Sequence, residues 1–296
     1  MIRKLLFLAA IIFFLGYYSV SAKGESPSDN EQINEFSLSG FGDRGKKAWD
    51  ISAKSADILA DTVNLKTVVG NFYGEKEQVK LTADKGNFLK NEGKVHLEDN
   101  VIITTASGAE LKTSSLDWDR KEKTITTNDR VDITKNNMIT VAQGAVAESG
   151  LSKVKLQKDI TVEITPEKKT DNDSTGKTII TCDGPLDIDY ERNIANFNKN
   201  VIVERPDMKI MSDTMEVHFV KSSGGKSSGN PGETLSDISN KINRIIARGN
   251  VKIIRGENTS FSNEAVYDAV SKKITLSGQP KLVINSTEKI DASSRN

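Results

Sequence analysis

Two pairs of aspartates have a spacing at which carboxylates can perform acid–base chemistry, namely Asp117 with Asp119 and Asp187 with Asp189. In an extended strand, which rises about 3.3 Å per residue, the members of each pair share one face and lie about 7 Å apart. That distance is compatible with glycosidic bond cleavage, a reaction that some β-solenoid proteins catalyse. However, an apolar residue separates the aspartates of each pair, as on the wet face of a strand, and no His, Lys or Arg constellation repeats around them. We therefore predict that the protein is not an enzyme.

Few other residues could bind a metal or act as a nucleophile. Cys182 is the single cysteine, so no intramolecular disulfide can form. The two histidines, His96 and His218, lie on the polar phase of alternating segments, so we expect them to face solvent, and no Cys/His cluster predicts a metal. Residues 224–227, Gly-Gly-Lys-Ser, resemble a phosphate loop, but Val220 stands where that loop needs its first glycine. The sequence therefore predicts no cofactor.

Positive and negative charges balance, with 41 Lys and Arg against 41 Asp and Glu in 296 residues. A surface that binds the phosphates of nucleic acid needs an excess of cations. The charged residues are also interspersed along the chain, which is typical of a solvated surface. Nucleic acid is therefore not an expected partner.

The N-terminal residues predict export from the cytoplasm. Arg3 and Lys4 precede an apolar run from Leu5 to about Val20, the pattern of a secretory signal or a membrane anchor. The run is intermediate in length between a signal core and a spanning helix of about 20 residues. Small residues near Ala22 also fit a cleavage site. Residues 1–22 are thus predicted to be an apolar helix, either an inner-membrane anchor or a cleaved signal.

The rest of the chain is predicted to consist of β-strands. From Phe36 onward apolar and polar residues alternate with a period of two, and β-branched residues are frequent. Such alternation places one set of side chains inside and the other outside. Clear examples are Val79–Ala83, Ile160–Ile164, Leu186–Tyr190 and Met215–Phe219.

A short sequence motif, which we call the recurring phrase, is repeated along the chain. In it, Gly, Asn or Asp precedes a segment of the type Val-x-Ile. We interpret the Gly/Asn/Asp part as a turn between strands. Three of the five steps between phrases are 29 or 30 residues, and the two longer steps contain the polar inserts 166–177 and 221–232. A fixed period predicts stacked units that share one core, although similar hairpins in an ordinary β-sandwich are the alternative. In the six repeats, the residue immediately before the apolar segment is Asn100, Arg130, Asp159, Asn200, Asn250 and Gln279 in turn.

In their order along the chain, these segments resemble the lipopolysaccharide-export protein family LptC, followed by a module that resembles the LptA/OstA repeat. The resemblance covers roughly 250 residues. The LptC-like segments are Leu38–Gly42, Lys47–Ala53, Val63–Leu65, Asn71–Tyr73, Val79–Gly86, Val95–Ile103, Ser107–Leu111 and Leu116–Thr127. The LptA-like segments are Asn198–Val201, Ile246–Val251 and Ser262–Ala265 with Tyr267.

The resemblance implies an all-β protein, an open twisted β-jellyroll of stacked antiparallel strands with two modules in series after the N-terminal helix. It also implies that the protein binds the acyl chains of lipopolysaccharide and transfers them across the periplasm. The implied partners are lipopolysaccharide, the membrane subunits of an export ABC transporter and an LptA-like periplasmic protein. A non-enzymatic β-solenoid scaffold or adhesin is the alternative function. The expected segments are an anchor or signal (1–22), a spacer (23–34), an LptC-like module (35–165), a linker (166–177), an LptA/OstA-like module (178–285) and a tail (286–296).

The alternating phase also predicts which residues carry the function. Side chains on the interior phase of the first module are expected to line the path of the acyl chains, and small residues among them to leave room for a chain. The strands at the two ends of the stack are expected to be unpaired edges that dock onto neighbouring proteins. The predicted lining is Trp49, Ile51, Ala53, Leu81, Ala83, Val101, Ile103 and Trp118, and the predicted edge residues are Phe36, Leu38, Leu282, Val283 and Ile284.

Overall fold

The computed structural model describes residues 31–42, 45–74, 78–148, 151–165, 176–219 and 242–284. The regular elements within these ranges are β-strands, which confirms the all-β prediction. No helix in these ranges is long and apolar enough to cross a membrane. The predicted N-terminal helix, most of the predicted linker and the Gly-Gly-Lys-Ser motif lie outside the described residues.

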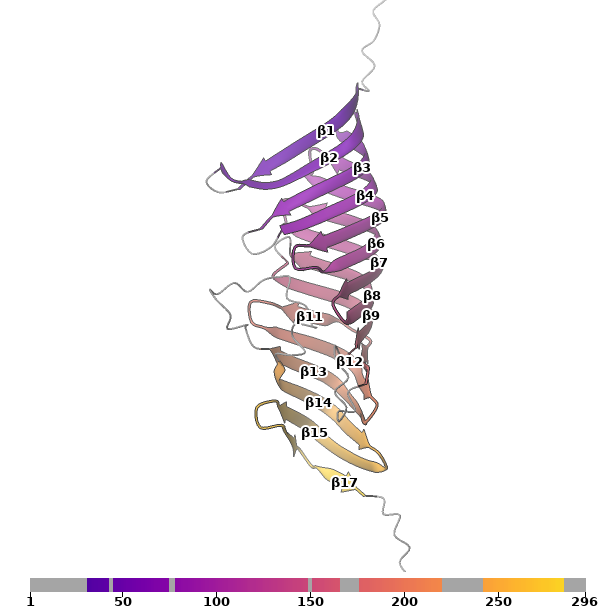
Figure 1. The fold of residues 1–296 in the computed structure, drawn as a ribbon, viewed down its shortest axis with the longest axis vertical. Coiled ribbons are helices and arrows are strands. Elements are labelled where there is room, and N and C mark those ends of the chain that lie inside the picture. The colour runs from indigo at the N-terminus through magenta and orange to yellow at the C-terminus, as the bar shows by residue number, and fades with distance from the viewer. Residues whose placement is uncertain are drawn as a thin grey trace, which may run out of the picture.

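The strands form one antiparallel sheet in which each strand pairs with the next along the chain (Figure 1). At two positions in the sheet, two short strands in succession take the place of one long strand. Strands β10 and β11 both lie between β9 and β12, and strands β16 and β17 both pair with β15. The chain therefore climbs from one end of an elongated molecule to the other. The strands are β1 (Glu31–Phe41), β2 (Lys47–Ile58), β3 (Thr62–Tyr73), β4 (Gln78–Leu89), β5 (Lys94–Thr105), β6 (Glu110–Asp119), β7 (Thr124–Lys135), β8 (Met138–Glu148), β9 (Lys153–Ile164), β10 (Thr178–Cys182), β11 (Leu186–Asp189), β12 (Ile194–Arg205), β13 (Met208–Phe219), β14 (Ile242–Arg255), β15 (Asn258–Asp268), β16 (Lys273–Ser277) and β17 (Lys281–Val283).

At five of its six occurrences the recurring phrase marks a bend in the middle of a strand, so the prediction of a turn between strands was wrong there; at Gln279 it does lie between two strands, β16 and β17. Asn100, Asn200 and Asn250 have left-handed φ values of 51°, 52° and 47°, and the ladder shifts register at each of them. Left-handed residues serve hairpin turns and mid-strand bulges alike. The two cases therefore look the same in a local sequence, and the pairing of neighbouring strands distinguishes them. Two further left-handed positions, Glu35 in β1 and Thr67 in β3, lack the Asn/Asp/Gly signal and were missed.

These mid-strand bends crease the sheet into a trough with two walls. In β3, β5, β7, β9, β12 and β14 the residue that follows the bend is 0–1 % exposed, and its partner on a neighbouring strand is small. A large residue facing a small one lets the two walls meet at the crease without overpacking. Val68 pairs with Ala53 on one side and Ala83 on the other. The other pairs are Val101 with Thr113, Val131 with Ala142, Ile160 with Cys182, Val201 with Ser212, and Val251 with Ser262.

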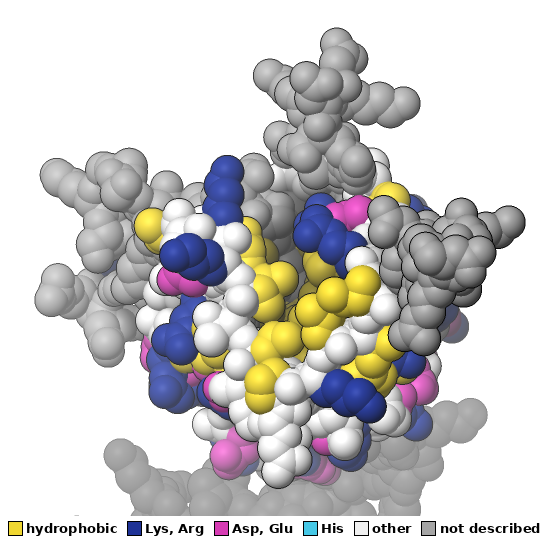
Figure 2. Space-filling view, turned by 90° about the horizontal axis from the view of Figure 1, so that it is seen from below, with side chains coloured by type: hydrophobic (Ala, Val, Ile, Leu, Met, Phe, Trp, Pro, Cys, Tyr) yellow, Lys and Arg dark blue, Asp and Glu magenta, His cyan; other side chains and the backbone are white. Residues whose placement is uncertain are grey.

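The ends of the strands form the two lips of the trough. We call the first lip the edge that carries the turns β2–β3, β4–β5, β6–β7, β8–β9, β11–β12 and β15–β16, and the second lip the edge that carries β5–β6, β7–β8, β12–β13 and β14–β15. Figure 2 looks into the trough from the end near β17 and shows apolar side chains on the two facing walls.

Two apolar cores lie along the trough. One extends from Ile51 to Trp118 and the other from Val131 to Ala265. The sheet itself continues without interruption from β9 to β10, where Thr178 pairs with Ile164. The division into modules at 166–177 stays a prediction.

Candidate lipid-binding trough

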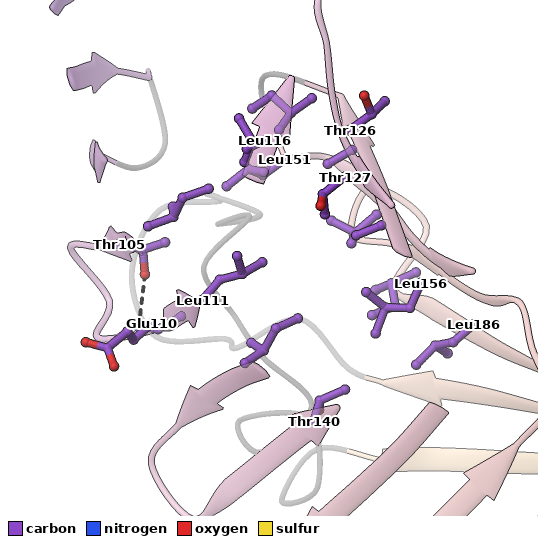
Figure 3. Close-up of a pocket in the computed structure, with 18 of the residues that line it drawn as sticks. Thr105, Glu110, Leu111, Leu116, Thr126, Thr127, Thr140, Leu151, Leu156 and Leu186 are labelled. Carbon is purple, nitrogen blue, oxygen red and sulfur yellow. Dashed lines mark hydrogen bonds between the residues drawn. The ribbon is translucent and has the colours of Figure 1, made fainter. Parts of the chain in front are cut away.

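A first cavity of about 140 Å³ lies between the walls in the middle of the trough. Its lining comes from both walls and is almost entirely apolar, with Glu110 as its one charged residue among those the structure describes. In Figure 3 the side chains of Leu111, Leu116, Leu156 and Leu186 surround a common space. The lining reaches the second lip at Thr105 and the first lip at Leu151 and Tyr190. Other lining residues are Ile103, Ile125, Ile133, Met138, Val154 and Ile188.

A second and larger cavity, of about 460 Å³, lies further along the trough towards β17. Its walls are formed by strands β9, β10 and β12 to β16 and are again rich in isoleucine and valine. Charged residues line its margins: Arg205, Asp207 and Arg255 belong to the second lip, and Lys272 to the first. The apolar lining includes Val162, Ile180, Val203, Ile210, Val217, Ile245, Ile253 and Ile274.

A pair of buried side chains separates the two cavities. Leu186 on β11 and Phe197 on β12 are cross-strand partners and are 0 % and 1 % exposed. Leu186 lines the first cavity and Phe197 lines the second. These two neighbouring side chains therefore form the partition between the first and second cavities.

Aromatic rings fill the trough near its β1 end. Trp118, from the first lip, packs edge-on against Trp49 and Phe72, from the second lip, with ring centroids 5.5 Å and 5.0 Å apart. The guanidinium of Arg120 lies over three rings, 4.6 Å from Trp49, 5.6 Å from Phe88 and 6.0 Å from Trp118. We call these five residues the aromatic bridge. The cavities beside it measure only about 10 and 20 Å³, so the bridge closes this part of the trough.

The residues predicted to line the acyl path all lie on the interior side of the sheet, in three settings. Ile51, Leu81 and Val101 belong to the buried core, Trp49 and Trp118 to the aromatic bridge, and Ile103 lines the first cavity. Ala53 and Ala83 face Val68 at the crease, where their small size lets the walls meet. Whether these eight residues contact a lipid stays a prediction.

Sequence reasoning missed the larger cavity, because it named interior residues only in the first module. The signal was present in the second module, where apolar residues such as Ile180, Val203 and Ile210 follow the same period of two. The alternation alone did not show that a larger space remains between the walls there. The size of that space depends on how the strands stack.

The candidate carboxylates shape turns and the outer face of the sheet. Asp119 accepts hydrogen bonds from the backbone N–H groups of Glu122 (3.0 Å) and Lys121 (2.9 Å), which lower the pKa of its carboxyl. Asp189 caps the equivalent turn between β11 and β12, and Asp187 pairs with Lys155 at 3.2 Å. A general acid needs a raised pKa, whereas the surroundings of Asp119 favour its ionised form.

The cysteine and histidines also have local structural partners. Burial at the crease raises the pKa of the Cys182 thiol to about 11, so this group stays protonated at neutral pH. His96, on the outer face, lies 2.6 Å from Asp117 and 3.0 Å from Glu98. Burial acts to lower the pKa of His96, but hydrogen bonds to these two carboxylates outweigh it and raise the pKa. His218 is partly buried and bonds to Glu216.

A single antiparallel sheet creased into an apolar trough defines a class of protein, the open β-jellyroll, whose interior can hold an apolar ligand along its length. Comparison with known proteins agrees with this class. The profile described as "Lipopolysaccharide-assembly, LptC-related" matches residues 5–165, more than half of the chain, and the chain therefore belongs to this family. A second profile, "LptA/(LptD N-terminal domain) LPS transport protein", matches residues 185–294.

Among solved structures, the chain is similar to LptH of Pseudomonas aeruginosa, described as the LptA-homologous periplasmic component of a lipopolysaccharide transport device. The two chains are 12% identical over 70% of this chain and 95% of LptH, with a TM-score of 0.18. No curated protein matched the sequence. Membership of the LptC family places the protein in lipopolysaccharide transport across the periplasm, among transport proteins that are not enzymes.

Proposed function

We propose that the trough shelters the acyl chains of lipopolysaccharide, and that the protein forms one segment of a bridge from an inner-membrane ABC transporter to the outer membrane. The apolar space between the walls is the observation that carries this proposal. Residues 1–22 would anchor the chain to the inner membrane; a mature chain beginning at Lys23 would instead indicate a soluble periplasmic protein.

The energetics of carrying a lipid favour an apolar interior of this kind. Burying one methylene group is worth about 0.8 kcal/mol, so a chain of about a dozen carbons needs nearly 10 kcal/mol of apolar shelter. A single hydrogen bond contributes only about 1 kcal/mol net, so polar contacts cannot replace this shelter. Side chains that are partly exposed inside the cavity, such as Ile103, Leu111 and Ile133, offer apolar surface to a chain.

Site-specific photo-crosslinking in living cells tests the proposal. A benzophenone side chain at position 111, in place of Leu111, would project into the first cavity, and we expect it to capture lipopolysaccharide. The matched control is position 112, because Lys112 is the next residue on β6 and is exposed on the opposite face. Equal capture at the two positions, or capture at neither, would show that the cavity does not carry the lipid.

We further propose that the terminal strands dock onto the neighbouring segments of the bridge. Within the described residues, β1 pairs only with β2 and β17 only with β15, so each presents one free edge. Leu282 and Ile284 at the β17 end are 60 % and 66 % exposed, whereas Phe36 and Leu38 of β1 are partly buried. An exposed apolar edge invites pairing with another strand, and β-augmentation by an LptA-like partner would satisfy it.

A proline at position 283 is expected to weaken this docking. Docking would convert β17 from an edge strand to an interior strand, where proline removes a ladder hydrogen bond and is not tolerated. In a pull-down assay the Val283→Pro protein should capture an LptA-like partner on the order of tenfold less well, from the loss of one or two bonds of about 1 kcal/mol each. Val283→Thr is the control, since it keeps the N–H group and the β-branched shape. Undiminished capture by Val283→Pro would exclude this edge as the docking site.

A further inference from the structure

We propose that the cations at the two lips of the second cavity bind the phosphate headgroup of the amphiphile whose chain occupies that cavity. The inference rests on the proposed function and adds a second, polar subsite to it. We name the subsite the lip cluster and define it as Arg205, Asp207, Arg255 and Lys272.

The two arginines of the lip cluster converge on one carboxylate. Arg205 ends β12 and Arg255 ends β14, and Asp207 lies in the turn between β12 and β13. The Nε atom of Arg205 is 3.3 Å from Oδ1 of Asp207, and Nη2 of Arg255 is 3.5 Å from Oδ2. Two guanidinium groups are therefore held at the same point of the second lip.

Lys272 supplies a cation from the opposite side. It lies in the turn between β15 and β16, on the first lip, and lines the same cavity. Figure 2 shows Lys and Arg side chains on both sides of the apolar hollow. A headgroup at the mouth of this cavity would therefore meet positive charge from both lips.

The charge of the lip cluster is specific to this cavity. Three cations and one carboxylate give it a net charge of 3 − 1 = +2. The first cavity, by contrast, has Glu110 as the one charged residue of its described lining, and Glu110 pairs with Lys112 at 2.8 Å; the whole chain is neutral. Of these two cavities, only the second therefore has an excess of cations in its described lining.

The chemistry of these side chains suits a phosphate group. Arginine presents a planar fork of N–H donors that matches phosphate oxygens, and lysine adds a compact point charge. Asp207 occupies only part of this donor capacity, and the Arg255 side chain is 72% exposed, so its donors remain accessible from solvent. An apolar cavity beneath such donors selects an anion that carries an apolar chain.

Binding of three small probes to the full-length protein tests the inference. Dodecyl phosphate and dodecyl maltoside carry the same chain with a charged or a neutral headgroup, and inorganic phosphate carries no chain. Below the micelle concentration, we expect the protein to bind dodecyl phosphate on the order of tenfold more tightly than dodecyl maltoside. This preference should shrink as salt is raised from about 0.1 M to 1 M, because the Debye length falls from about 10 Å to about 3 Å.

The triple variant Arg205→Gln/Arg255→Gln/Lys272→Gln should lose the preference while binding dodecyl maltoside as before. The matched control replaces three cations that pair on the outer face, Lys85→Gln/Lys94→Gln/Lys112→Gln, and should keep it. A preference that survives in the lip variant, or that is lost equally in the control, would overturn the inference. So would competition by inorganic phosphate at the same concentration, because the site would then bind the free anion. Binding of neither dodecyl probe would instead contradict the proposed function itself.

Discussion

Replacing Phe197 by alanine should lower the free energy of unfolding by about 3–5 kcal/mol, the usual cost of removing a buried phenylalanine side chain. Phe197 is 1% exposed and stands between the two cavities, against Leu186. The cost of such a truncation grows with the volume left empty. Because the trough already contains open space on both sides of this contact, the neighbouring strands have little to collapse onto.

The control for this prediction is Phe261→Ala on β15. Phe261 is 38 % exposed, with the ammonium of Lys252 5.7 Å above its ring, so its removal leaves no interior cavity and should cost less than about 1 kcal/mol. Urea denaturation measures both changes, and hydrogen exchange should show the loss of protection concentrated in β11, β12 and β13. Equal destabilisation by the two variants would contradict the prediction that removing the Phe197 ring leaves an uncollapsed cavity.

Replacing Trp118 by alanine should also cost about 3–5 kcal/mol and should open the trough at its β1 end. Trp118 is 7% exposed, and both Trp49 and Phe72 pack against its ring. Removing the ring takes away the central member of the aromatic bridge, so the two small cavities beside it should merge.

Fluorescence reports this opening directly, because Trp49 becomes the single tryptophan of the Trp118→Ala protein. Its emission should shift to longer wavelength as water reaches the ring. Trp118→Phe is the matched control: it keeps an aromatic edge and removes an indole N–H that has no hydrogen-bond partner in the described part of the chain. We expect that variant to be nearly as stable as the unaltered protein, since an unsatisfied buried donor costs about 1–3 kcal/mol. If both variants showed the same red shift, the aromatic bridge would not be what closes the trough.

Much of the interior surface could be predicted from local alternation. Ile51, Leu81 and Val101 are buried as their phase predicts, because neighbouring side chains on a strand must point to opposite faces. The same reasoning could not say which interior residues meet a cavity and which meet the crease. Ala83 and Ile103 share one phase, yet Ala83 faces Val68 at the crease and Ile103 lines the first cavity.

The sequence by itself determined that the protein is all-β, that its strands repeat along the chain, and that one set of side chains faces inward. These properties follow from residue types over a few neighbouring positions. Only the tertiary structure decided that Asn100 and Asn200 bend strands rather than end them, since a left-handed residue suits both, and the ladder of the adjacent strand selects between them.

The tertiary structure also decided which distant residues meet across the trough. Trp49 and Trp118 come together from opposite lips, and Arg255 and Lys272 line the second cavity from opposite lips. Such contacts depend on the angle of the crease and on how many strands separate the two positions. Both quantities arise from the packing of the whole sheet, and no local pattern in the chain encodes them.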